Sequence, residues 1–357
     1  MNKSMTISGT VVLITLILCT RSVALDPDEL LAIHHEYVTA MNAHDLDKMM
    51  SYWADDGIYD LVSTPPPVPK SYVQSYFEYL FSTFLDFHET EGRTLATNNL
   101  VVGENETVRT DPTFGNKLVV SPHLSIYDFE GDKIKQVTTY KDNLSDMVQR
   151  GQMDLPEMPK LVPSVEVPDP EPTGLSPMEA NTELIARWNS RDAAHVAKMD
   201  RADFHIYAGP LGTTLDRAAM MALNEMYFTA FPDVQIEVVR MVDLQDSWVL
   251  TELISKGTHK GDFMGVPASG YLTGLRVVWL TRYDADGLVT EQSFYYDNIT
   301  LLNQMTAPPY LVDGIWITTI PTPMGNLNLT TTYVAQDTER TRYSGSLEEV
   351  NPMPLLV

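Results

Sequence analysis

Residues 257–270 have the sequence GTHKGDFMGVPASG, a glycine-rich connection between two stretches that are predicted to be strands. The stretch before it, 248–253, alternates apolar and polar residues as a half-buried strand does. The stretch after it, 275–283, continues through the Asp-Gly turn of residues 284–287 into a further strand at 288–296. The connection therefore belongs to a meander of antiparallel strands.

Helices are predicted before these strands. Residues 177–190 and 215–231 carry apolar side chains at spacings of three and four, which is typical of amphipathic helices. Helices followed by an antiparallel meander predict an α+β fold and not a doubly wound parallel sheet.

The same pattern occurs twice along the chain. MNAHDLDK at 41–48 corresponds to WNSRDAAH at 188–195, and YKDNL at 140–144 corresponds to YYDNI at 295–299. Asn42 and Asn189 are 147 positions apart, whereas Asp142 and Asp297 are 155 positions apart. The second copy therefore has about eight more residues than the first between its Asn and its Asp. We predict two tandem domains, at 25–150 and 177–307.

Two segments lie outside this repeat. Residues 151–176 are rich in proline and acidic residues, which predicts a semi-rigid linker. Residues 308–357 form a β-prone C-terminal extension, in which 316–320 and 327–333 are predicted to pair as a hairpin.

The first 24 residues are predicted to be a signal peptide. Lys3 precedes an apolar run at 11–18 that is too short to span a bilayer, and Ser22-Val23-Ala24 offers a cleavage site. A lipoprotein anchor at Cys19 and an uncleaved N-terminal anchor are the alternatives. Cleavage after Ala24 predicts a secreted or periplasmic protein without any cysteine, hence without disulfides or a cysteine nucleophile. No later segment is apolar enough to predict a membrane contact after cleavage.

The charge of the chain limits its partners. The full chain has 48 Asp and Glu residues against 24 Lys and Arg residues. Phosphate binding needs clustered basic residues, so a nucleic-acid partner is excluded from our expectations. Asp284-Ala285-Asp286-Gly287 lacks the later ligands of a calcium loop, and no metal site is predicted.

The second copy resembles a known family. Its FPDV at 231–234, the connection at 257–270, RYDADG at 282–287 and the pair Asp297-Asn298 resemble the SnoaL-like polyketide (ester) cyclases of the NTF2-like superfamily. The first copy resembles the same fold more faintly, with TFGN at 113–116 in place of the long connection. The resemblance implies two cones, each a curved antiparallel sheet closed by N-terminal helices around an apolar cavity, which could pack as an internal pseudo-dimer.

The resemblance also implies a catalytic carboxylate. In these cyclases a carboxylate in the cavity removes a proton from an activated carbon without a metal or cofactor. Asp297 matches that carboxylate and Asp142 is its counterpart in the first copy, although either residue also fits a helix N-cap. Gln292 and Ser293 stand where the family has a His-Trp pair, and Trp279 replaces a polar residue.

Further candidate residues surround this position. His259, as a second catalytic candidate, is expected at the cavity mouth or in a surface turn. His205 and Tyr207 alternate with an apolar residue and face either the cavity or solvent. The remaining substrate-binding candidates are the loop residues Phe263 and Met264, together with Trp279, Gln292 and Asp142.

Two functions follow from these observations. One is a cofactor-free cyclase, isomerase or hydrolase acting on a small apolar carbonyl or ester compound, with Asp297 as the base. The other is a non-catalytic protein that binds small hydrophobic molecules, which the missing His-Trp pair favours.

Overall fold

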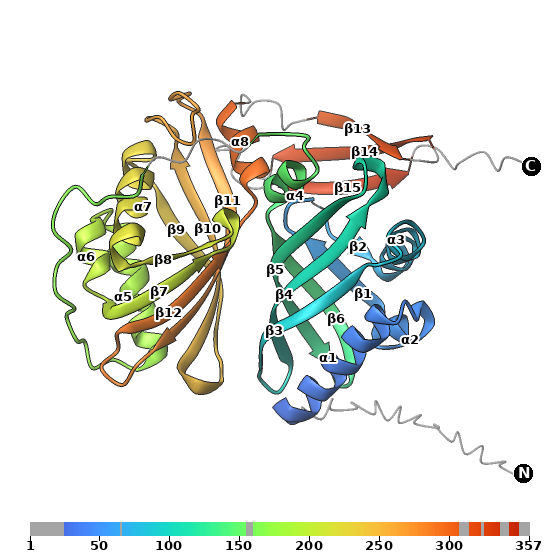
Figure 1. Cartoon of the computed structure of the whole chain (residues 1–357), viewed down its shortest axis with the longest axis horizontal. Coiled ribbons are helices and arrows are strands. Elements are labelled where there is room, and N and C mark those ends of the chain that lie inside the picture. Colours follow the sequence, from blue (N-terminus) through green and yellow to red (C-terminus); the bar gives the residue numbers. More distant parts are fainter. Residues whose placement is uncertain are drawn as a thin grey trace, which may run out of the picture.

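The computed structural model describes residues 25–64, 66–154 and 160–306, and the strands at 314–322, 325–335 and 343–349 (Figure 1). The predicted signal peptide and Cys19 lie outside the described residues. Within them the chain forms two six-stranded sheets, each preceded by helices, and a three-stranded sheet.

The first domain begins with a helix whose start is fixed by local chemistry. Asp26 caps this helix in a capping box with Glu29, and Pro27 occupies its first turn. Its elements are α1 (Pro27–Asn42), α2 (Leu46–Ser51), β1 (Trp53–Leu61), β2 (Val68–Pro69), α3 (Lys70–Thr83), β3 (His88–Ala96), β4 (Leu100–Asp111), η1 (Pro112–Phe114), β5 (Lys117–Glu130), β6 (Lys133–Lys141) and α4 (Asn143–Gln149).

The second domain repeats this plan. Ser176 and Glu179 form the equivalent capping box at its first helix. Its elements are α5 (Pro177–Asn189), α6 (Ala193–Ala197), β7 (Asp200–Ala208), η2 (Gly209–Leu211), β8 (Thr213–Asp216), α7 (Arg217–Ala230), β9 (Gln235–Asp243), η3 (Gln245–Ser247), β10 (Trp248–Thr258), β11 (Leu272–Tyr283), β12 (Val289–Tyr295) and α8 (Asn298–Thr306).

The two sheets have the same topology. The strand orders are β2-β1-β6-β5-β4-β3 and β8-β7-β12-β11-β10-β9. In each sheet one pair is parallel, β1 with β6 and β7 with β12, and the remaining pairs are antiparallel. The predicted α+β class and the two tandem cones are confirmed.

The outer faces of the two sheets lie against each other. In Figure 1 the sheets stand side by side; α1, α2 and α3 of the first domain and α5, α6 and α7 of the second lie on the sides away from the other domain, whereas α4 and α8 meet between the domains. A shared apolar cluster joins β4, β5 and β6 to β10, β11 and β12; it includes Leu100, Val102, Leu124, Ile126, Leu250, Val278 and Leu280. The inner face of each sheet is left to face its own helices.

The connection between the domains is attached to the second one. Glu171 N donates to Lys198 O at 2.8 Å, and Thr173 N and Gly174 N both donate to Asp286 O at 2.9 Å. Residues 160–176 contain no helix or strand, which agrees with their proline content.

The C-terminal strands are β13 (Gly314–Thr322), β14 (Gly325–Ala335) and β15 (Tyr343–Glu349). The first two pair antiparallel, as the sequence predicts, and β15 adds to the other edge of β14. Among the described residues, no helix is both long and apolar enough to cross a membrane.

Candidate functional site

The two cones enclose very different amounts of space. The cavity of the first domain has a volume of about 820 Å³, whereas that of the second domain has about 100 Å³. A small organic molecule therefore finds room in the first domain without any movement of the protein.

Part of this difference comes from the connection between two neighbouring strands. In the first domain, β4 and β5 are joined by residues 112–116. In the second domain, β10 and β11 are joined by residues 259–271, whose Phe263 is buried and packs at 5.5 Å from Tyr227 and 5.6 Å from Phe231, ring centre to ring centre. The longer connection therefore fills part of the second cone with Phe263.

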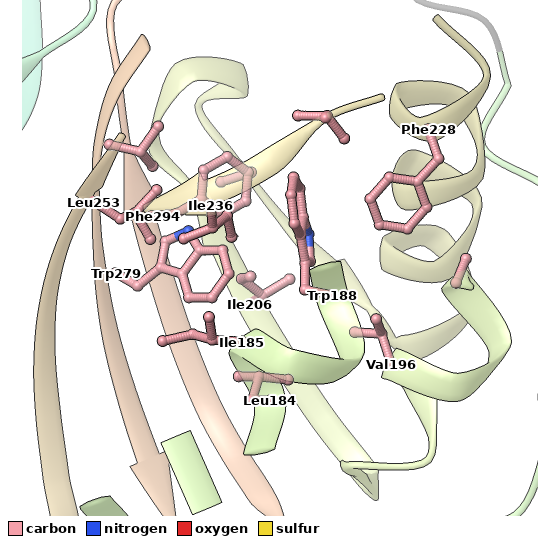
Figure 2. Close-up of a cluster of buried hydrophobic side chains, with 14 of the residues drawn as sticks. Leu184, Ile185, Trp188, Val196, Ile206, Phe228, Ile236, Leu253, Trp279 and Phe294 are labelled. Carbon is pink, nitrogen blue, oxygen red and sulfur yellow. The ribbon is translucent and has the colours of Figure 1, made fainter. Parts of the chain in front are cut away.

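The rest of the difference comes from side chains on the sheet. In the first sheet, Ser125 pairs with Thr139, and at the equivalent place in the second sheet Trp279 pairs with Phe294. Figure 2 shows Trp279 and Phe294 gathered with Trp188 inside the second domain. The rings of Trp188 and Trp279 are 6.3 Å apart. Large aromatic rings thus occupy the space that small hydroxyl residues leave open in the first cone.

A buried carboxyl group lies in the wall of the larger cavity. Glu89 on β3 is 6% exposed, and Asn105 Nδ2 donates to its Oε1 at 2.6 Å. Burial raises the pKa of Glu89 to about 7. Its backbone is fixed by Asn42, whose side chain bonds to both N and O of Glu89. Glu89 is therefore a well-positioned group that is part ionised near neutral pH.

His123 on β5 stands beside this carboxyl group. Its Nε2 lies 3.7 Å from Glu89 Oε2, and its Nδ1 lies 3.1 Å from Ser121 O. Since a carbonyl oxygen only accepts, the proton is assigned to Nδ1, which leaves the Nε2 lone pair toward Glu89. Burial lowers the pKa of His123 to about 4, so the imidazole is neutral at pH 7.

A second group of charged side chains lines the same cavity. Arg109 Nη2 is 2.7 Å and Lys141 Nζ 2.6 Å from Asp146 Oδ2, and Arg150 Nε is 2.7 Å from Asp111 Oδ2. Burial acts to raise the pKa of Asp146, but the two cations outweigh it and lower this pKa to about 2. Asp146 is therefore ionised and holds two cations at the cavity wall.

The helix side of the cavity is mostly aromatic. Its lining includes Tyr37 from α1, Tyr76, Phe77 and Tyr79 from α3, and Phe84 just after α3. Tyr76 and Tyr79 are 39% and 40% exposed, so they stand where the cavity opens to solvent. The site thus combines an apolar, aromatic wall with a polar and charged sheet.

Sequence reasoning missed these residues. The available signal was the repeated Asn: Asn42 binds the backbone of Glu89, and Asn189 binds the backbone of Ile236 in the same way. Glu89 in the first domain therefore corresponds to Ile236 in the second. The replacement of an apolar residue by a carboxylate indicates a specialised site in the first domain.

The structure places the predicted base outside both cavities. Asp297 Oδ1 accepts from Asn143 N at 2.9 Å, and its Oδ2 accepts from Thr300 N at 2.9 Å. Asp142 Oδ1 accepts in turn from Asn298 N at 2.9 Å. The two aspartates cap the helices α4 and α8 and bridge the domains, and neither lines a cavity. The prediction of Asp297 as cavity base and Asp142 as its counterpart in substrate binding is therefore corrected to helix capping.

His259 and Met264 also lie away from the cavity wall. His259 is fully buried, packs against Phe231, and has its Nδ1 3.1 Å from Ser269 Oγ. Burial lowers the pKa of His259. Met264 is buried in the turn of the loop with a positive φ of 49°. Both residues shape the loop, because neither belongs to the lining of the second cavity.

His205 and Tyr207 face the other way. Their neighbours Phe204 and Ile206 on β7 are buried in the cone, so His205 and Tyr207 point to the outer face of the sheet. There they line a groove of about 320 Å³ between the domains. Of the two places that the sequence left open, the structure shows the outer face and not the cavity, because strand alternation alone does not say which face is inside.

Three other candidates do line the smaller cavity. Phe263, Trp279 and Gln292 are among its lining residues, and Gln292 Nε2 donates to Thr281 Oγ1 at 2.9 Å. Asp200, which the sequence analysis did not select, lines it as well, and burial raises its pKa to about 8.

Each domain matches a family model of known proteins. Residues 179–305 match the SnoaL-like polyketide cyclase family, and residues 34–137 match the SnoaL-like domain family. No curated protein matches the chain.

Solved structures resemble single domains of the chain. AclR, a candidate hydroxylase from Streptomyces galilaeus, is 29% identical over 36% of this chain and 80% of its own, with a TM-score of 0.34. IdmH, a candidate polyketide cyclase from Streptomyces antibioticus, is 27% identical over 37% of this chain and 100% of its own, with a TM-score of 0.34. A candidate SnoaL-like polyketide cyclase from Jannaschia Sp. CCS1 is 21% identical over 40% of this chain and 99% of its own, with a TM-score of 0.35.

Proposed function

Because this chain carries two SnoaL-like domains in tandem, we propose that it is a cofactor-free cyclase or isomerase acting on a small, mostly apolar carbonyl or ester compound. The cavity of the first domain is the active site, and Glu89 is the general base. The observation that carries this proposal is a buried carboxyl group with a pKa of about 7 in the wall of a cavity of about 820 Å³.

The chemistry follows from the surroundings of Glu89. Its carboxylate removes a proton from the carbon next to a substrate carbonyl, and the electron pair of that C–H bond moves into the enolate. Protonated Glu89 then returns the proton to another carbon in an isomerisation, or to the new alkoxide after ring closure. A pKa near neutral pH suits both steps, and the lone pair of His123 Nε2 can accept a hydrogen bond from the protonated carboxyl.

A carrier of small hydrophobic molecules is the second candidate. The aromatic wall formed by Tyr37, Tyr76, Phe77, Tyr79 and Phe84 favours it, because such side chains bind an apolar ligand without any reaction. Turnover that depends on Glu89 would support the enzyme, whereas ligand binding without turnover would support the carrier.

We also propose that the two domains form an internal pseudo-dimer. Support comes from matching contacts across the outer faces: Tyr140 Oη donates to Glu252 Oε1 at 2.8 Å, and Tyr295 Oη donates to Glu104 Oε1 at 3.2 Å. These are equivalent positions, from β6 to β10 and from β12 to β4. Export to the periplasm or the medium remains part of the proposal and rests on residues 1–24.

The first experiment is native mass spectrometry of the protein from its own host, with extraction of any bound molecule. The compound class found then guides a screen of β-keto compounds and activated esters. We expect turnover to rise with pH through about 7 and to level off above it, because Glu89 reacts as the carboxylate.

The matched variants are Glu89→Gln and Glu78→Gln. Glu78 is an exposed glutamate on α3, so its change tests only the loss of a surface charge. Turnover should fall at least about a hundredfold in Glu89→Gln and stay unchanged in Glu78→Gln. Equal turnover in Glu89→Gln and the wild type would remove Glu89 as the base.

A further inference from the structure

The charged side chains of the first cavity do not balance one another. Three cations line it, Arg109, Lys141 and Arg150, and the carboxylates that pair with them are Asp146 and Asp111. Asp146 is shared between Arg109 and Lys141. One positive charge in the cavity wall is therefore not compensated by these pairs.

Glu89 does not supply the missing negative charge. Its contacts are Asn105 and His123, and its pKa is raised by burial and by Glu91. The Glu89 carboxyl group therefore makes no ion pair with Arg109, Lys141 or Arg150, although all four line the same cavity.

The two groups are close enough to hold one small molecule. Glu89 is the strand partner of Thr107, and Arg109 follows two residues later on the same inward face of β4. Two residues of a strand span roughly 7 Å. Lys141 is the strand partner of His123, which itself faces Glu89.

From this arrangement we propose that the ligand of the first domain is an amphipathic anion: an apolar, ring-sized body with a carboxylate that binds Arg109, Lys141 and Arg150. The inference rests on the proposed function and narrows its substrate class to acids. The aromatic side chains on the helix side of the cavity contact the apolar body of this ligand.

The pairs within the protein also favour an anion. Burial lowers the pKa of Lys141, because its ammonium group is removed from water. Its carboxylate partner, Asp146, is shared with Arg109. A bound carboxylate would supply a second acceptor and offset this cost. In the second domain Leu275 and Val277 replace Ser121 and His123 on the equivalent strand, and among the described residues no lysine or arginine lines its small cavity.

The test compares two probes with the same ring system, 2-naphthoate and its methyl ester, by calorimetric titration of the whole protein at pH 7. We expect naphthoate to bind at least about tenfold more tightly than the ester, as one charge-assisted hydrogen bond would give. Raising the salt from low to high concentration should weaken naphthoate binding and leave the ester unchanged.

Two variants locate the effect. Lys141→Gln and Arg150→Gln should each reduce the preference for naphthoate, and Glu106→Gln, on the exposed outer face of the same sheet, should not. Arg150 is more exposed than Arg109, so its change tests the site even if Lys141→Gln fails to fold.

The outcomes distinguish this inference from the proposed function. Equal binding of both probes, tighter binding of the ester, or a preference that survives both variants overturns the anion site alone. Binding of neither probe overturns the anion site and also the proposed function, because the cavity would then not receive apolar ring compounds.

Discussion

Two carboxyl groups in this protein show how surroundings decide a role. Glu89 and Asp297 are both almost fully buried, at 6% and 3% exposure. Asp297 accepts hydrogen bonds from two backbone N–H groups and from the Thr300 hydroxyl, so both its oxygens are bonded within the protein. Glu89 faces an open cavity with one strong donor, Asn105. Only Glu89 keeps a free oxygen for a ligand.

The raised pKa of Glu89 predicts a pH-dependent cost in stability. Below pH 4.5 the carboxyl is protonated in both folded and unfolded states, so it costs nothing. As pH rises toward 7, the unfolded chain loses this proton first and the folded state loses stability, by about 3 kcal/mol once the pH is above 7. Glu89→Gln removes the charge and keeps an acceptor for Asn105.

Urea unfolding at several pH values measures this effect. Glu89→Gln should match the wild type at pH 4 and exceed it by about 3 kcal/mol at pH 8. His123 also titrates in this range, but both proteins carry it, so its contribution cancels in the comparison. A variant that is equally stable or less stable at pH 8 would contradict a stability cost from the buried Glu89 carboxylate.

The capping role of Asp297 gives the opposite expectation. Asp297→Ala removes the acceptor for the first turns of α4 and α8, so it should cost about 1–2 kcal/mol of unfolding free energy. Turnover or ligand binding at the first domain should stay within a factor of two or so, since Asp297 lines no cavity. Loss of turnover in a folded Asp297→Ala protein would restore the family-based interpretation.

At the scale of elements, the order of helices and strands could be predicted from the sequence. Which of the two domains has an open cavity could not. Apolar periodicity and the Asp-Gly turn are local signals, and they predicted both helices and the meander correctly. The second copy matched the family pattern best, yet its cavity is nearly filled by Trp188, Trp279 and Phe294. Whether a cone is open depends on side chains from four or more elements, which no short motif records.

The connection at 259–271 offers a test of how the second cone is closed. Phe263→Ala removes a buried ring that packs on Tyr227 and Phe231, so we expect a loss of about 3–5 kcal/mol in unfolding free energy. The space left is apolar, and benzene should enter it and recover part of the loss.

Thermal unfolding with and without benzene measures this recovery. Leu272→Ala is the control, because Leu272 is 46% exposed just after the same connection. It should change stability by less than about 0.5 kcal/mol and should not respond to benzene. If Phe263→Ala shows no benzene effect, the loop does not close the cavity.

At the scale of the whole molecule, the two domains are joined by charges as well as by an apolar cluster. Arg93 pairs with Glu104 in its own domain and with Glu291 in the other, and Arg240 pairs with Glu252 and with Asp128 in the same manner. Arg276 adds an ion pair with Asp60 across the domains. The sequence repeat could predict two domains, but not which faces meet, because that depends on outward residues with no periodic signal.

These matched contacts predict that the domains unfold together. Tyr140→Phe and Tyr295→Phe each remove one hydrogen bond between domains, and the acceptors keep a partner because Glu252 retains Arg240 and Glu104 retains Arg93. Each change should therefore cost only about 1–2 kcal/mol, and the double variant should show the sum.

Hydrogen exchange resolved by peptide is the measurement, because it reports the two sheets separately. Each variant should raise exchange equally in β6 of the first domain and β12 of the second, since one opening event exposes both. Tyr72→Phe, at an exposed tyrosine of α3, should change neither sheet. If each variant raised exchange only in its own domain, the two domains would open independently and the pseudo-dimer proposal would be wrong. Equal effects in both sheets would mean that the two domains open together. The shape of the larger cavity in the first domain would then depend on the nearly filled second domain.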